Sequence, residues 1–410
     1  MRSTGRRPFF AVLIGVVLAG GAETAVAQQP PSGADAPRSG LLISTDSGYD
    51  TAESGSGDAR AARRDSPGRL HAEWFRLAST RRSVVRFWTG VTAGVPDSDR
   101  THAEAFAFAA STVLSRRTHF DFDARVNAAP VDLFSALGSA GPSATPVTTT
   151  SSSFTEGRMI TYDARAVLSR ALGARTSMNI ELSHTGSSTE RRGVRNERIG
   201  GLVRRRIGPF STIRAGYAFD VAVAASSGAQ AIDRRHDVDL GVDYARPLSF
   251  SRHTQIGFGT GTSVLTNAMG RRLRLALSSS LARDWSRAWS ARLEYNRPIE
   301  YLAGFAQPFL SDAVTVGANG RLGRRTTLTL ASGFSRGGVG FGATRPQFSS
   351  RSTSGRLTVP MGRAWAVEFE AHDARYQLGA AVPLPSFIPE RFVRRGARLG
   401  FVWSSPWTGR

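Results

Sequence analysis

The residues best able to carry chemistry are seven histidines and the carboxylates near them. His372 follows Glu368 and Glu370 at alternate positions, so the three side chains share one face of an extended strand. Such a row could hold a cation. Alternation alone produces the same row on any strand with a hydrated face, so we interpret it as a polar surface. No histidine has zinc spacing with a second ligand on a common face, and we predict no metal site.

The chain also lacks the sequence motifs that indicate common types of enzyme chemistry. We find no nucleophile elbow, no P-loop and no dinucleotide fingerprint in a credible context. The sequence therefore predicts no catalytic residues, no cofactor and no enzyme.

The first residues indicate export. Arg2, Arg6 and Arg7 precede an apolar run over 9–18, and Ala25-Val26-Ala27 follows, as in a secretory signal peptide. We predict a signal peptide over 1–27, with the mature chain starting at Gln28. Residues 28–80 are rich in Pro, Gly, Ser and Arg and are predicted to form a disordered periplasmic tail.

Charge and cysteine content exclude several classes of protein. There is no cysteine, which excludes disulfides, thiolate metal sites and a lipidated N-terminal cysteine. The net charge of +21 comes entirely from arginine. Because the arginines are dispersed and the chain is exported, we do not expect nucleic acid as a partner.

From residue 81 the sequence alternates between apolar and polar residues, the period of a β-strand whose two faces meet different surroundings. Val238, Leu240 and Val242 share one face, and the neighbouring aspartates share the other. A soluble sandwich could show this pattern. However, very short connections, such as Gly208-Pro209, alternate here with longer polar ones, as in transmembrane barrels.

This pattern predicts an all-β fold, a transmembrane antiparallel up-and-down β-barrel of about sixteen strands over residues 81–410, with fourteen as an alternative. Each span is close to the ~9–11 residues that a tilted strand needs to cross a membrane. An even number of strands would place both mature termini in the periplasm. The predicted strands cover 82–92, 103–114, 118–128, 158–168, 176–186, 197–206, 211–223, 236–246, 252–265, 271–283, 288–298, 312–322, 325–336, 352–360, 364–376 and 391–404. The predicted long connections are 129–157, 187–195, 224–234, 300–311, 337–350 and 378–390.

By this pattern the chain resembles the bacterial outer-membrane β-barrel proteins, porins among them. Its last strand resembles the C-terminal strand that the assembly machinery of that family reads, although the family usually ends on an aromatic residue and this chain continues to Arg410. The resemblance implies a location in the outer membrane of a Gram-negative envelope, with outer-membrane lipids and the barrel assembly machinery as partners. The oligomeric state is left open.

His184 deserves comparison with outer-membrane phospholipases, which place a catalytic histidine on the lipid-facing surface of a barrel. It continues the apolar face of Met178, Ile180 and Leu182. Those enzymes have a serine two residues further on, whereas Gly186 stands at that position here. We interpret His184 as an interfacial residue, and a lipid-modifying enzyme as the least favoured function.

The predicted polar faces carry nearly equal numbers of acids and bases, whereas much of the arginine excess lies at the short turns. An acidic patch of Asp237, Asp239 and Asp243 is predicted beside a basic arc. The predicted lumen-lining residues are Asp237, Asp239, Asp243, Arg272, Arg274, Arg292, Glu294, Arg321, Glu368, Glu370, Arg394 and Arg398. The predicted membrane-interface aromatics are Phe210, Phe250, Trp285, Trp289, Trp365 and Trp403.

A barrel of 16–18 strands leaves an aqueous channel, and the small residues of these polar faces cannot fill it. The sequence therefore predicts a channel for passive diffusion of small hydrophilic solutes, with weak ion selectivity. The alternative is a structural or surface-interaction barrel whose pore is blocked by its loops.

Overall fold

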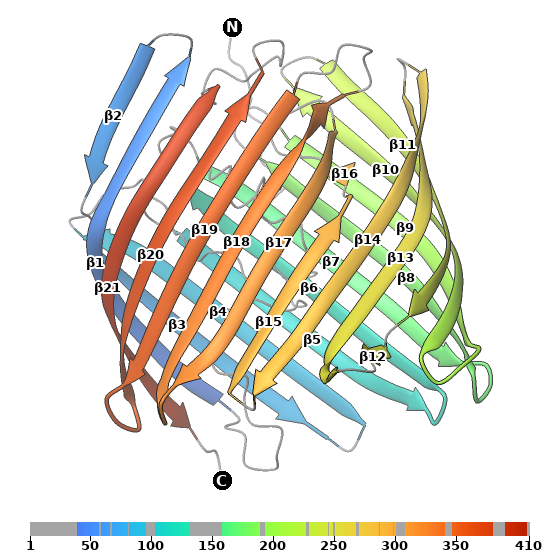
Figure 1. The fold of residues 1–410 in the computed structure, drawn as a ribbon, viewed down its shortest axis with the longest axis horizontal. Helices are drawn as coiled ribbons and strands as arrows, with labels where there is room; N and C mark the ends of the chain where they lie inside the picture. The colour runs from blue at the N-terminus through green and yellow to red at the C-terminus, as the bar shows by residue number, and fades with distance from the viewer. Residues whose placement is uncertain are drawn as a thin grey trace, which may run out of the picture.

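The computed structural model describes residues 39–407, with gaps at 57–58, 66–67, 81, 96–102, 131–157, 189–192, 227–228, 245, 249–250, 268–269, 287, 298, 301–307, 341–346 and 380–389. The described residues are arranged as β-strands in a single antiparallel sheet that curls into a barrel (Figure 1). The signal peptide predicted over 1–27 lies outside the described residues. No helix in the described part of the chain has the length and hydropathy needed to cross a membrane.

The sheet is built from consecutive strands that each pair with their neighbours in sequence. In chain order they are β1 (Ser39–Ser56), β2 (Ala59–Asp65), β3 (Gly68–Ser79), β4 (Ser83–Val95), β5 (Ala103–Ser115), β6 (Thr118–Pro130), β7 (Arg158–Ala171), β8 (Thr176–Ser188), β9 (Gly193–Arg206), β10 (Ser211–Ser226), β11 (Ala229–Tyr244), β12 (Arg246–Leu248), β13 (Ser251–Asn267), β14 (Gly270–Ser286), β15 (Trp289–Asn296), β16 (Ile299–Glu300), β17 (Phe309–Leu322), β18 (Thr326–Val339), β19 (Gln347–Pro360), β20 (Trp365–Leu378) and β21 (Arg391–Trp407).

The sheet closes because the first strand pairs with the last. β1 lies antiparallel to β21 from Ser39, opposite Trp407, to Gly55, opposite Arg391. β2 and β3 pair with β1 in one common register and so form one interrupted strand. β16 continues β15 in the same way, and β12 continues β11 with a shifted register on β13. The barrel therefore has 18 strands. The predicted fold class is confirmed, the sandwich alternative is wrong, and the predicted count of sixteen is slightly too low.

The two additional strands come from the segment predicted to be a disordered tail. All sixteen predicted strands coincide with strands of the barrel, but β1 and β3 occupy residues 39–56 and 68–79, so the barrel begins before residue 81. β1 is held by backbone hydrogen bonds to β21 on one side and to β2 and β3 on the other. Without β1, the edge of β21 would be unpaired.

Short connections lie at one rim and most of the longer ones at the other, as predicted, but β10 and β11, and β13 and β14, are joined at the second rim by only two residues each. One rim carries tight turns, such as the one at Gly208, where the amides of Ile207 and Gly208 bond the Ser211 carbonyl. Gly323 turns with φ of +72°, a conformation that favours glycine. Most of the longer connections, at the opposite rim, lie outside the described residues. The loop predicted over 224–234 is wrong, because β10 runs to Ser226 and β11 starts at Ala229.

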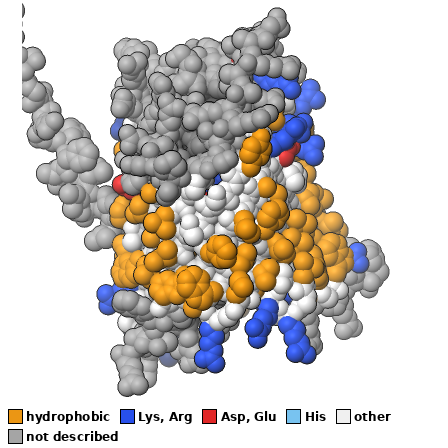
Figure 2. Space-filling model, turned by 90° about the vertical axis from the view of Figure 1, so that its left-hand side faces the viewer, with side chains coloured by type: hydrophobic (Ala, Val, Ile, Leu, Met, Phe, Trp, Pro, Cys, Tyr) orange, Lys and Arg blue, Asp and Glu red, His pale blue; other side chains and the backbone are white. Residues whose placement is uncertain are grey.

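The outer face of the barrel exposes large apolar side chains. Leu273 and Leu240 are 71% and 65% exposed, and this exposure of apolar surface is unfavourable in water but favourable in hydrocarbon. On the side of the molecule in Figure 2, apolar side chains gather in a band around the barrel, and arginines lie at its edges. Arginines of the tight-turn rim, such as Arg117, Arg175, Arg324 and Arg363, are all exposed. The outer surface thus has the layering that a membrane requires.

The assignment of faces can be tested with one substitution made on each side of β17. Val316 lies on the outer face and is 46% exposed, so Val316→Arg should destabilise the barrel in lipid vesicles by ~2–4 kcal/mol. Asn319 lies on the inner face, and Asn319→Arg should cost less than about 1 kcal/mol there. The measurement is urea-induced unfolding from vesicles. Equal losses would contradict the assignment.

Candidate functional site on the inner wall

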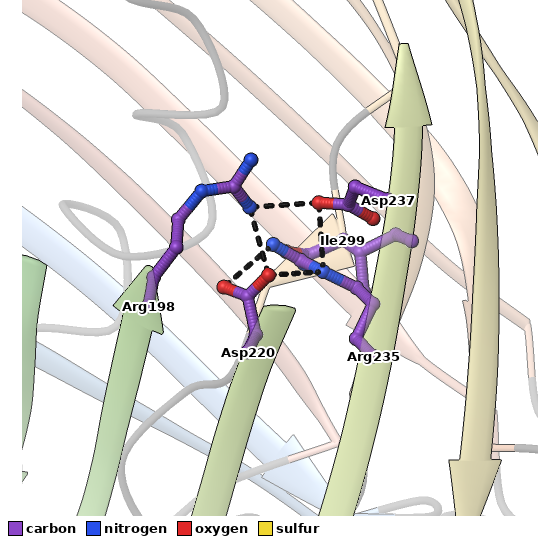
Figure 3. Close-up of polar contacts among 5 residues, drawn as sticks. All are labelled: Arg198, Asp220, Arg235, Asp237 and Ile299. Carbon is purple, nitrogen blue, oxygen red and sulfur yellow. Dashed lines mark hydrogen bonds and ion pairs between the residues drawn. The ribbon is translucent and has the colours of Figure 1, made fainter. Parts of the chain in front are cut away.

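Three neighbouring strands bring a group of four charged side chains together on the inner face of the barrel. Arg198 lies on β9, Asp220 on β10, and Arg235 and Asp237 on β11 (Figure 3). Asp220 is opposite Arg198 on one side and opposite Arg235 on the other. Because residues two apart on a strand share a face, Arg235 and Asp237 both point toward this group.

The four side chains form a closed set of ion pairs. Nη1 of Arg198 donates to Oδ2 of Asp220 at 2.8 Å and to Oδ2 of Asp237 at 2.7 Å. Nη2 of Arg235 donates to Oδ1 of Asp220 at 3.0 Å, and its Nε lies 3.2 Å from Oδ2 of Asp237. The carboxylate of Asp220 is 1% exposed, so its charge depends on these two guanidinium groups. Nη1 of Arg235 also donates to the carbonyl of Ile299 at 3.2 Å, which ties β16 to β11.

A second group surrounds Arg214 of β10. Its Nε donates to Oδ1 of Asp239 at 2.9 Å, its Nη1 to Oδ1 of Asp243 at 2.7 Å, and its Nη2 to the carbonyl of Thr260 at 3.2 Å. The guanidinium lies flat across two strands because glycines lie beneath it. A Cβ added at Gly259 would come within 2.4 Å of Nη2, and one added at Gly241 within 2.9 Å of Nε.

These contacts correct the predicted acidic patch. Asp237, Asp239 and Asp243 do share the inner face of β11, but all three are paired with arginines of β9, β10 and β11. The negative charge of these carboxylates is therefore offset by the paired arginines, and this part of the wall does not present free carboxylates to the lumen.

A third group lies where the first and last strands meet. Asp46 of β1 accepts two hydrogen bonds from Arg69 of β3, at 2.9 and 3.0 Å, and one from Arg398 of β21, at 3.2 Å. Both arginines are buried. On the adjoining strands, Arg356 donates to Glu370 at 3.2 Å and Thr358 donates to Glu368 at 3.1 Å. The seam of the closed barrel is thus joined by charged side chains as well as by backbone.

The predicted basic arc is dispersed and partly bonded. Arg274 of β14 donates to the carbonyl of Ser311 of β17, and Arg292 pairs with Glu294. Arg321 is exposed near the tight turns, and Arg272 is half-buried. Arg394 and His372 are buried, and the described residues contain no group of side chains that could hold a metal ion.

Apolar side chains also point inward, at the rim of the longer connections. The ring centroids of Phe309 and Phe348 are 5.0 Å apart, and those of Tyr376 and Phe392 are 5.7 Å apart and stacked. Phe309 is 1% exposed and Phe348 is 3% exposed. With Val339 and Leu378 these residues form an inner aromatic cluster. Water does not reach these side chains, so the barrel is packed rather than open beside them.

Of the aromatic residues predicted at the membrane interface, the five that the structure describes lie near the tight turns. Phe210, Trp285 and Trp365 are exposed. The Trp289 ring lies over Gly320, where a Cβ would come within 2.2 Å of the ring. The ring centroids of Trp365 and Trp403 are 6.4 Å apart. Phe250 lies outside the described residues.

Sequence reasoning missed four residues that turn out to organise the inner wall. Arg198 is in phase with Arg204 on its strand, and Arg235 is in phase with Asp237, so extending the alternation by a few residues would have found both. Asp46 and Arg69 fall in the segment predicted to be disordered, where no strand was expected.

The layered, closed wall of 18 antiparallel strands decides the type of fold. The chain has the fold of an outer-membrane β-barrel. No protein-family model matches the sequence, and no curated protein matches it.

Solved structures that resemble this barrel include two classes of Pseudomonas aeruginosa protein. The siderophore receptor PirA matches with a TM-score of 0.42 and 10% identity, over 89% of this chain and 80% of the receptor. A mutant of the ferric enterobactin receptor PfeA matches with a TM-score of 0.44 and 8% identity, over 90% and 81%. OccK2 in complex with glucuronate matches with a TM-score of 0.44 and 10% identity, over 89% and 98%.

The importance of the buried ion pairs can be measured by replacing one carboxylate with an amide. Asp220→Asn should lower the free energy of unfolding by ~3 kcal/mol, because two guanidinium groups lose a buried partner. Glu181→Gln is the matched control. Glu181 pairs with Arg165 at 2.7 Å, but the two side chains are 31% and 51% exposed, and its loss should cost less than about 1 kcal/mol. Equal stabilities of the two variants would refute a role for burial.

Proposed function

We propose that this protein is an outer-membrane channel through which small hydrophilic solutes diffuse passively, with weak ion selectivity. The observation that carries the proposal is the wall itself, 18 strands with a polar inner face. Barrels of this size enclose more space than their own side chains can fill, so water can occupy the remainder.

The pairing of inner charges supports weak selectivity. The inner carboxylates of β10 and β11 that are described above each have an arginine partner. Salt bridges present a solute with dipoles instead of a ring of like charge, and rings of like charge are what bias wide pores toward one ion sign.

The proposed orientation places the tight turns in the periplasm and the longer connections outside the cell. Ser39 and Trp407, opposite each other on β1 and β21, lie at the same end of the wall. The proposal includes export by the predicted signal peptide, insertion by the barrel assembly machinery and a surrounding of outer-membrane lipids. The exposed arginines of the turns fit this orientation, because their stems can lie along apolar surface while their guanidinium groups bind lipid phosphates.

The selectivity proposal predicts the effect of removing inner positive charge. Replacing Arg272, Arg274, Arg292 and Arg321 with Gln should shift the reversal potential under a salt gradient toward cations, and more strongly at low salt, where screening is weaker. The wild type should show little preference. A matched variant removes four exposed arginines of the tight-turn rim, Arg117, Arg175, Arg324 and Arg363, and should shift the potential less. Strong anion selectivity in the wild type would contradict the proposal.

One observation favours a second candidate, a structural or surface-interaction barrel with a blocked pore. The inner aromatic cluster is buried, so the barrel is narrowed beside it. If a channel runs past this cluster, Phe348→Ala should raise single-channel conductance in a planar bilayer, because it removes a ring from the narrowed region. Leu328→Ala, on the outer face of β18, is the control and should leave conductance unchanged. The absence of conductance in both the wild type and Phe348→Ala would favour the blocked barrel.

A lipid-modifying enzyme is the least favoured of the three functions. His184 lies on the outer face, with its Nδ1 3.8 Å from Oε1 of Glu197. The hydroxyl-bearing residues beside it on β8, Ser183 and Thr185, alternate with it and so lie on the inner face. On the described strand, His184 therefore has no neighbouring nucleophile.

A further inference from the structure

The outer face of the barrel carries a groove where five strands, β6 to β10, lie side by side. Its volume is about 480 Å³. Hydrogen-bonded neighbours place the outward residues in rows across the strands. One row is entirely apolar and consists of Phe122, Ala166, Leu182, Ile199 and Phe219.

Small residues flanked by large ones create the groove. Ala164 and Ala166 lie on β7, and the bulkier Phe122 and Leu182 stand on the strands either side. Because alanine ends at Cβ, the wall is hollow along β7 and higher beside it. Most of the exposed surface of the groove is apolar, as a hydrocarbon chain requires, although the groove is also lined by Arg165, Ser183, His184, Glu197 and Arg198.

The groove becomes polar toward the rim of the longer connections. The next row contains His184 and Glu197. Beyond them, Arg195 of β9 is exposed, opposite Gly186. Tyr162 lies over Gly186, where a Cβ would come within 2.4 Å of its hydroxyl oxygen, and its ring stacks on His184 at 5.3 Å.

Along the barrel wall, the apolar groove is followed by an aromatic ring and then by an exposed arginine. A membrane lipid has a matching order, with its acyl chains followed by its polar headgroup. His184 is the ninth residue of β8 counted from the tight turn, and ~9–11 residues cross the hydrocarbon. Arg195 therefore lies near the depth at which lipid phosphate groups are found, and the groove lies within the hydrocarbon layer. Arginine is well suited to phosphate because its planar donors bind two oxygens at once.

We propose that this groove is a specific site for one acyl chain of a phosphate-bearing lipid in the leaflet on the side of the longer connections. The chain lies over Ala164 and Ala166, and Arg195 binds the phosphate. The inference rests on the membrane location in the proposed function but does not depend on an open pore.

The test is lipid retention, measured by native mass spectrometry of the full mature chain released from micelles containing dipalmitoyl phosphatidic acid. The wild type should retain one lipid. Ala166→Phe fills the groove and should weaken binding about tenfold or more, equivalent to ~1.4 kcal/mol. Ala215→Phe adds the same ring to the outer face of β10, outside the groove, and should retain the lipid as the wild type does.

A second pair of variants tests the headgroup contact. Arg195→Gln should weaken binding of phosphatidic acid but not of dipalmitoylglycerol, which has the same chains and no phosphate. Arg205→Gln, on the same face of β9 near the tight turn, should change neither. Folding of each variant is checked by circular dichroism.

Equal retention by all four variants would overturn the site, as would loss of lipid in Ala215→Phe equal to that in Ala166→Phe. Loss of lipid with Ala166→Phe but not with Arg195→Gln would overturn the phosphate contact. If the wild type shows no conductance, and lipid is lost only in Ala166→Phe and Arg195→Gln, the proposed channel is refuted while the proposed lipid site is supported.

Discussion

The structure depends on one constraint, that every strand of the sheet must have a partner on both sides. A strand in hydrocarbon cannot leave its amides and carbonyls unpaired, because no water is present to bond them. The pairing of β1 with β21 satisfies this constraint for the whole sheet. Once the sheet is closed, it has an inside and an outside, and the alternation of each strand assigns every side chain to one of them.

The inner charges follow from that closure. A carboxylate on one strand can meet guanidinium groups from two neighbours, as Asp220 meets Arg198 and Arg235. Asp46 does the same across the seam, with Arg69 and Arg398. Arg214 goes further, since it reaches from β10 across β11 to the carbonyl of Thr260 on β13. These pairs connect strands sideways, in the same direction as the backbone hydrogen bonds, and so they add to the interactions that hold neighbouring strands together.

The sequence predicts most of the fold but little of this arrangement. Strands such as Asp237 to Tyr244 were predictable because an apolar face against lipid and a polar face against the lumen leave a period of two in the sequence. β1 was missed because its glycines and serines weaken that period, and its partners are determined by the far end of the chain. The ion pairs were missed for a related reason. Which arginine meets Asp239 depends on the register between strands, and neither residue type nor spacing along one strand contains it. The inner aromatic cluster similarly combines residues from the five consecutive strands β17 to β21, and sequence spacing within one strand does not show which of them meet.

The position of the seam also determines the order of events when the protein forms. The hydrogen bond between Asp46 and Arg398 joins residues 352 positions apart, so the contact that completes the sheet has one of the largest sequence separations in the chain. Contacts between distant residues form slowly, since the entropy of closing the loop must be overcome first. Until β21 has been synthesised and delivered, β1 has a free edge, and free edges are templates for aggregation. Closure of the sheet therefore depends on β21, the seventeen-residue strand Arg391–Trp407, because only its pairing removes the free edge of β1.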